Sequence, residues 1–200
     1  MDGMVATSGH WPADHESKPA PPPLDRVQAL VNTVELPDGQ DRLATVADAA
    51  PWLVDQGLLD AGADLDDADL TRLRDVREAL RALVVHNGGG PAPTKAELAP
   101  LRAVADAGSA RATLDADGRV SVAAAGGTLT ERLVDLLLVI RDAQRDGTWA
   151  RLKACANDEC RWAFYDRSRN RGGQWCEMSS CGNKLKNREF RARRKQAAKG

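Results

Sequence analysis

Apolar residues recur every three or four positions along most of the first 150 residues. This spacing predicts helices over 24–34, 45–57, 67–86, 94–108 and 128–147. Four of the five segments end at a glycine or just before one, which is a helix-stop signal. Three of the segments open with Thr-x-x-Asp or Thr-x-x-Glu, the capping-box spacing. The strongest pattern lies in 67–86, with inward positions Leu70, Leu73, Val76, Leu80, Leu83 and Val84.

Two short alternating segments interrupt the helical pattern. Residues 112–114 and 120–122 flank an Asp-Ala-Asp-Gly sequence at 115–118, which predicts a β-hairpin. The sequence therefore favours an α+β class in which the region 24–150 is a predominantly helical domain with one small hairpin.

The two ends of the chain differ from this domain. Residues 1–23 are rich in Pro and Gly and are predicted to be a disordered tail, in which His10 and His15 are solvated rather than metal-bound. No apolar run reaches the roughly 18 residues of a transmembrane helix, and the N-terminus lacks the apolar core of a secretory signal. A cytoplasmic location is expected.

Charge is strongly segregated along the chain. Residues 151–200 contain 14 Lys and Arg against 5 Asp and Glu, a net charge of +9, whereas residues 1–150 have a net charge of −10. Such a division favours a polyanionic partner for the C-terminal part. Mutual attraction between the two oppositely charged parts is the alternative explanation.

All four cysteines lie in the region 151–200, as Cys155-x4-Cys160-x15-Cys176-x4-Cys181. Two short pairs separated by a loop supply the four soft ligands that tetrahedral zinc requires. Disulfides are disfavoured in a reducing compartment, and iron–sulfur motifs use other spacings, although both alternatives stay open at this point. A four-cysteine site has no free coordination position, so one structural zinc ion is expected.

The residues between and after these cysteines combine aromatic and basic side chains. Trp162, Phe164 and Trp175 are expected to form a small core around the metal, with base stacking as the alternative. Three arginines alternate between positions 167 and 171, and a basic helix is predicted over 184–195. Both segments are typical of phosphate-binding surfaces.

The cysteine spacing, together with Tyr165-Asp166-x-Ser168-x-Asn170-Arg171, Trp175-Cys176 and Cys181-Gly182-Asn183-Lys184, resembles the CGNR-type zinc finger. The preceding region resembles the ABATE domain that is joined to this finger, through Asn32-Thr33 and through Trp52-Leu53 followed by Gly57-Leu58. The resemblance covers about residues 24–194. It implies a stress-related transcription regulator with a DNA-binding zinc finger. Lys184 stands where the motif has Arg, which keeps the charge but loses bidentate geometry.

The leading hypothesis is a zinc-dependent DNA-binding regulator whose helical domain senses a ligand or mediates association, for example as a homodimer. A protein-interaction or RNA-binding module is the alternative. An enzyme is not expected, because the sequence has no phosphate loop, nucleophile elbow or Cys/His pair outside the cysteine cluster. Asn32 and Thr33 have either a helix-terminal hydrogen-bonding role or a place in a ligand pocket. The residues expected to contact nucleic acid are Arg167, Arg169, Asn170, Arg171, Lys184, Lys186, Asn187, Arg188, Arg191, Arg194 and Lys195.

Overall fold

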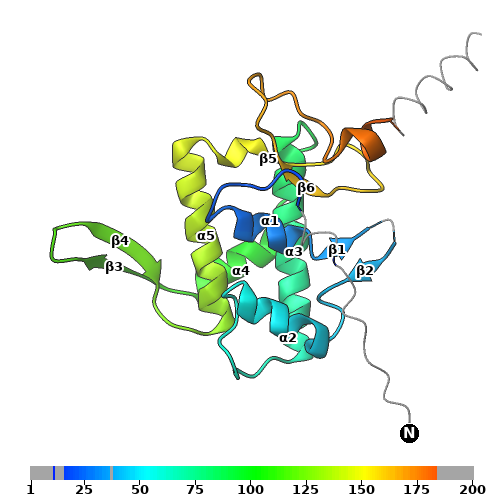
Figure 1. Ribbon diagram of the computed structural model, residues 1–200. Helices are drawn as coiled ribbons and strands as arrows, with labels where there is room; N and C mark the ends of the chain where they lie inside the picture. The colour runs from blue at the N-terminus through cyan, green and yellow to red at the C-terminus, as the bar shows by residue number, and fades with distance from the viewer. Residues whose placement is uncertain (1–10, 12–15, 37, 184–200) are drawn as a thin grey trace, which may run out of the picture.

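The computed structural model describes residue 11, residues 16–36 and residues 38–183. Its helical part contains α1 (Asp25–Val31), α2 (Val46–Asp55), α3 (Asp67–Asn87), α4 (Ala99–Ala107) and α5 (Leu129–Asp146). The two long helices α3 and α5 flank the shorter α1 and α4, while α2 lies at the end of the molecule farthest from the cysteine-rich region (Figure 1). Within the described ranges, no helix combines the length and the hydropathy needed to span a membrane.

The helices follow the apolar spacing of the sequence closely. Helix α3 buries Leu70, Leu73 and Val76 on one face, and its N-terminus is capped by the Asp66 carboxylate, which accepts a hydrogen bond from the Asp69 amide. Both expected capping bonds form at Thr128 before α5. All five predicted helices are present, with small differences at their ends.

One helix begins later than its capping signal suggests. Thr94 and Glu97 exchange the hydrogen bonds of a capping box, but the residues between them form turns, and α4 begins only at Ala99. Pro100 explains the shift, because proline has no amide hydrogen and is accommodated in the first turn of a helix. The Thr94–Glu97 capping box therefore lies in the turn before α4 and does not mark the first residue of the helix.

In the part of the chain that the structure describes, the strands form three separate antiparallel pairs. They are β1 (Val34–Glu35) with β2 (Gln40–Asp41), β3 (Ala110–Leu114) with β4 (Val120–Ala124), and β5 (Leu152–Ala154) with β6 (Ala163–Tyr165). The β3–β4 pair is the predicted hairpin, and it projects away from the helices (Figure 1). The α+β class is confirmed.

The third strand pair joins the cysteine-rich region to the helices. β5 lies against α3, and Leu152, Ala154, Ala163 and Tyr165 are buried in the same hydrophobic core as the helices. A 3-10 turn, η2 (Trp149–Arg151), leads from α5 into β5, and a short π-helical turn, η3 (Met178–Gly182), carries the last cysteine. The region after residue 150 is thus built directly on the helical core.

The N-terminal region before α1 requires a correction. The backbone of residues 16–23 lies against α1 and β6, and Ala20 is buried in the main core. Its amide donates a hydrogen bond to the Gln28 side chain. The prediction of disorder is therefore wrong for residues 16–23, because short-range composition does not reveal contacts with strands 140 residues away. His10 and His15 lie outside the described residues.

Candidate metal centre

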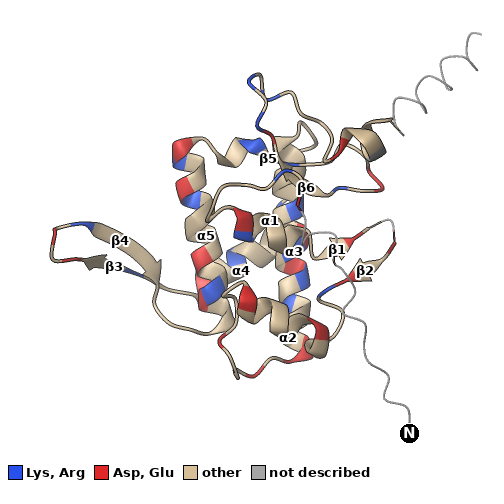
Figure 2. Ribbon diagram, viewed as in Figure 1, with Lys and Arg blue, Asp and Glu red and all other residues tan. Residues whose placement is uncertain are grey.

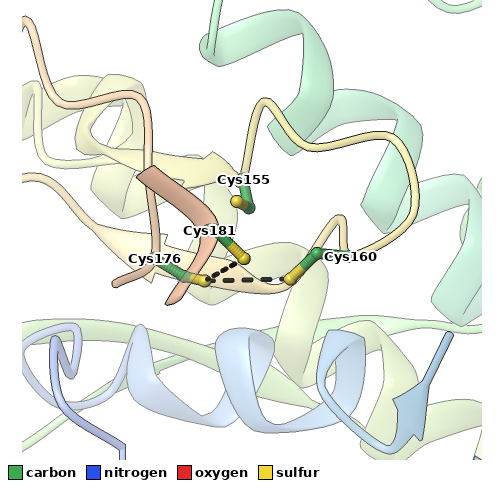
Figure 3. A group of neighbouring side chains, drawn as sticks. All are labelled: Cys155, Cys160, Cys176 and Cys181. Atoms are coloured by element: carbon green, nitrogen blue, oxygen red, sulfur yellow. Dashed lines mark hydrogen bonds between the residues drawn. The ribbon is translucent and has the colours of Figure 1, made fainter. Parts of the chain in front are cut away.

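The four cysteines are brought together by the β5–β6 pair and the segment that follows it. Cys155 comes directly after β5, and Cys160 lies in the turn that leads to β6. Cys176 comes shortly before η3, and Cys181 lies within η3. In the turn, the Cys160 amide donates to the Asn157 carbonyl oxygen at 2.8 Å, and Arg161 adopts a left-handed backbone with φ of 48°. The turn between β5 and β6 brings the thiols of Cys155 and Cys160 close to those of Cys176 and Cys181 (Figure 3).

The distances among the four sulfur atoms fit a tetrahedral metal site. All four Sγ atoms lie within 4.8 Å of one another, and the Cys160–Cys176 and Cys176–Cys181 separations are both 3.8 Å. A zinc ion with Zn–S bonds of about 2.3 Å would place tetrahedral sulfur atoms about 3.8 Å apart. A disulfide bond needs about 2.05 Å, so the four cysteines are free thiols and the disulfide alternative is excluded.

The pKa values of three of the four thiols reflect how closely their sulfur atoms approach one another. The pKa of Cys155 is lowered to about 2, because the Cys160 and Cys176 thiols donate hydrogen bonds to its sulfur. The same contacts with Cys155 raise the pKa of Cys160 to about 12 and raise that of Cys176 as well. In the protein alone, Cys155 is therefore favoured as a thiolate, while Cys160 and Cys176 are favoured as protonated thiols. A divalent cation at the centre would allow all four to be thiolates, the form that binds zinc.

Aromatic side chains pack around the four cysteines. Phe164 is buried against Cys155, Cys176 and Cys181, and Trp162 and Trp175 pack on the same cluster. This packing confirms the expectation that the three aromatic residues form a small core around the metal. Because the cysteines are mostly buried and surrounded by apolar rings, the arrangement is that of a structural site rather than a catalytic one.

The arginine-containing loop between β6 and Cys176 is organised by the buried Asp166. Its carboxylate accepts hydrogen bonds from the Ser168 amide and hydroxyl and from the Gly173 amide, and it pairs with the buried Lys153 Nζ at 2.9 Å. Burial alone would raise the pKa of Asp166, but the hydrogen bonds from Ser168, Lys153 and Gly173 outweigh burial and hold this pKa well below its ordinary value. A charged carboxylate thus fixes both ends of the loop.

The three arginines of this loop are exposed. Arg167, Arg169 and Arg171 all lie on the surface, and Figure 2 shows positive charge along the loop above β5 and β6. The Arg167 guanidinium donates to the Pro19 carbonyl oxygen at 3.0 Å. Asn170, also exposed, accepts a hydrogen bond from the Gly172 amide and so helps to shape the loop. The basic segment from Lys184 to Lys195, with its seven expected contact residues, lies outside the described residues.

Asn32 and Thr33 lie in the core at the end of α1 and are hydrogen-bonded there. Both are almost fully buried. The Asn32 side chain accepts a hydrogen bond from the Ala163 amide at 2.7 Å and donates to the Ala163 carbonyl at 2.9 Å, as a neighbouring strand would do. Thr33 donates to the Leu30 carbonyl at the end of α1 and accepts from Arg77. Their hydrogen bonds therefore fit the helix-terminal role and attach β6 to the helical domain.

A second attachment comes from residues 16–20, here called the N-terminal strap. The Glu16 carboxylate accepts from Trp162 Nε1 at 2.8 Å and from the Asn32 side chain at 3.0 Å. The Lys18 carbonyl accepts from the Tyr165 amide at 2.9 Å, and its ammonium group donates to the Trp175 carbonyl at 2.6 Å. The strap thus contacts both sides of the metal site.

Sequence reasoning missed the strap and the Lys153–Asp166 pair. Lys153 carried a usable signal, because a lysine in the middle of a short apolar strand next to a metal ligand needs a buried partner. Glu16 and Lys18 carried none, since a charged residue in a Pro-rich stretch looks the same in sequence whether it is solvated or paired. Their partners become visible only when β6 is in place.

Comparison with known families agrees with this geometry. Residues 24–153 match the model of the ABATE family, described as "Putative stress-induced transcription regulator", and residues 151–194 match the model of the CGNR zinc finger. No curated protein matched the chain. Since the first match spans more than half of the chain, and since the four thiols have the spacing that zinc requires, the chain belongs to the ABATE family and carries a C-terminal CGNR zinc finger that binds one structural zinc ion.

Proposed function

We propose that this protein is a zinc-dependent DNA-binding transcription regulator. The observation that carries the proposal is the loop of three exposed arginines, held at both ends by a buried carboxylate and positioned beside the zinc site. Arg167 also bonds to the Pro19 carbonyl, but the described residues offer no side-chain partner to Arg169 or Arg171. Guanidinium groups on a preformed loop suit contact with DNA phosphates.

The structural zinc and the buried ion pair have a common effect in this proposal. The thiolates hold the two sides of the finger together, and Lys153 with Asp166 holds the loop between them. The loop then loses little conformational entropy when it binds, which favours affinity. The predicted basic segment after residue 183 would add further phosphate contacts.

The acidic helical domain has two roles in this proposal. The domain supplies the core on which β5 and β6 are built and, being negatively charged, it limits DNA binding to the face that carries the finger. We propose that it senses a ligand or mediates association of two copies.

A DNA titration over a range of salt concentrations tests the proposal. The variant Arg167→Ala/Arg169→Ala/Arg171→Ala should bind genomic DNA fragments more weakly at low salt. The slope of log affinity against log salt should become shallower by about three, since each lost phosphate contact changes it by about one. Fluorescence anisotropy measures both quantities.

A matched control separates the loop from net charge. Arg111→Ala/Arg119→Ala/Arg145→Ala removes three exposed arginines from other surfaces and leaves the finger unchanged. It should retain most of the affinity and the slope. If both triple variants behave alike, or if the loop variant binds like the unaltered protein while still holding zinc, the DNA-binding proposal fails and the protein-interaction or RNA-binding reading replaces it.

A further inference from the structure

A cavity of about 760 Å³ lies between helix α3 and the zinc finger. One wall is the side of α3 that carries Ala79, Ala82 and Val85, and the opposite wall is the strand end and turn at residues 154–156. The loop of residues 88–93 that follows α3 closes one end. The volume is in the range of small-molecule sites in proteins.

Alanine side chains line both walls, and valine and proline side chains add to the apolar lining on the helical side. Charged groups lie around it, four carboxylates and two guanidinium groups. The carboxylates belong to Asp75, Glu78, Glu97 and Asp158, and the guanidinium groups belong to Arg81 and Arg161. The cavity therefore has an excess of two negative charges.

Both cations are already paired within the protein. Arg81 is buried and donates to the Glu78 carboxylate at 2.9 Å, to the Arg161 carbonyl and to the Val31 carbonyl. The Arg161 guanidinium lies 3.5 Å from the Asp158 carboxylate.

The remaining two carboxylates pair with no cation among the described residues. In that part of the chain, Glu97 accepts hydrogen bonds from the Thr94 amide and hydroxyl, which lower its pKa and keep it charged. Asp75, exposed on α3, has no ion-pair partner among the residues that the structure describes. An apolar cavity with unneutralised carboxylates at its edge attracts a molecule with an apolar body and a positive charge.

We propose that this cavity binds a small amphipathic organic cation, such as a protonated amine on an aromatic or aliphatic body. The apolar part would lie between Ala82 and the 154–156 turn, and the ammonium group would face Asp75. This inference deepens the ligand-sensing part of the proposed function, because the wall at residues 154–156 contains the zinc ligand Cys155. An occupant would contact the helical domain and the finger at once.

Binding of 4-phenylbutylamine to the zinc-loaded full chain tests the site without DNA. In amide NMR spectra, the peaks of Gly88, Gly89, Ala154 and Ala156 should shift and saturate. The matched alcohol, 4-phenylbutan-1-ol, and the matched carboxylate, 4-phenylbutyrate, share the apolar body. Both should bind at least about tenfold more weakly, because the unpaired carboxylates attract only the amine.

Three variants make the result decisive. Ala82→Trp fills the cavity and should abolish the shifts, while Asp75→Asn should weaken amine binding several-fold without changing that of the alcohol. Asp106→Asn, an equal charge change on the exposed side of α4, should have no effect. Equal binding of amine and carboxylate overturns the ligand class, and shifts that persist in Ala82→Trp or fall elsewhere overturn the site. Neither outcome depends on whether the finger binds DNA, so this proposal and the DNA-binding proposal fail separately.

Discussion

At the scale of single residues, the finger depends on polar groups that are buried but fully paired. Lys153 and Asp166 are both almost inaccessible, with side chains 8% and 3% exposed. An isolated charge at such depth would be strongly unfavourable, whereas the pair satisfies both charges and the carboxylate also takes up two amides of the loop. The buried Lys153–Asp166 ion pair therefore holds the arginine-containing loop in one conformation.

Replacing Asp166 by alanine should destabilise the protein by about 3–5 kcal/mol, because Lys153 is then left as an uncompensated buried charge. Since the pKa of Asp166 is lowered in the folded state, its stabilising effect is complete above the ordinary Asp pKa and is lost only as the pH falls through the lowered value. Urea unfolding at pH 7, followed by circular dichroism, measures the full effect.

The double variant Asp166→Ala/Lys153→Met is the control for this prediction. It removes both charges and should recover much of the lost stability, because an apolar replacement of a buried pair is often neutral. The loop amides would still lack their acceptor, so loop order should not return. A loss below about 1 kcal/mol in the single variant would contradict the role assigned to the pair.

At the scale of elements, β3 and β4 form a hairpin that is almost entirely exposed. Their ten residues are exposed apart from Ala124, which is partly buried, and Leu114 and Val120 are 69% and 66% exposed. The hairpin meets the core only near its base, where the Ala124 amide donates to the Asp135 carboxylate. Alternation in the sequence predicted the strands correctly, but it did not reveal that neither face of the pair is covered.

Removal of the hairpin tests this description. Replacing residues 111–123 with two glycines should lower the free energy of unfolding by less than about 1 kcal/mol, because almost no apolar surface leaves the core. Ala110 and Ala124 are register partners, so a short linker can join them. Urea unfolding of the shortened chain gives the value, and a loss above about 3 kcal/mol would mean that the hairpin packs against the body.

At the scale of the whole molecule, the zinc finger and the helices share one core. Leu152 and Ala163 are completely buried among helical residues, and the side chains of Gln28, Asn32 and Asn87 hydrogen-bond to the backbone of β5, β6 and η2. A boundary near residue 151 remains a prediction about separate folding, yet packing runs continuously across it. Zinc binding is therefore coupled to the stability of the helical part.

Removing zinc should lower the melting temperature of the entire chain. If the loss of zinc lowers the free energy of unfolding by about 3 kcal/mol, the melting temperature should fall by roughly 6–12 °C for a protein of this size. Scanning calorimetry with and without a chelator measures it, and re-addition of zinc should restore the first value. Two transitions, the upper one unchanged by the chelator, would show instead that the helical domain folds independently.

The sequence by itself determined the local features of this protein. Helical periodicity, capping residues and the cysteine spacing are properties of neighbouring positions, so the five helices, the two strands of the β3–β4 hairpin and the set of zinc ligands could all be predicted. The order of residues around the loop also identified the CGNR zinc finger, because that motif is contained within about 30 positions.

Tertiary structure alone decided the long-range partners. Asn32 bonds to Ala163, Lys18 to Trp175 and Gln28 to the strap, and no local pattern distinguishes these polar residues from solvated ones. The cavity beside Cys155 likewise exists only where α3 and the finger turn face each other. Such contacts depend on which surfaces meet in the folded chain. That choice is made by the packing of the whole core and not by any single segment.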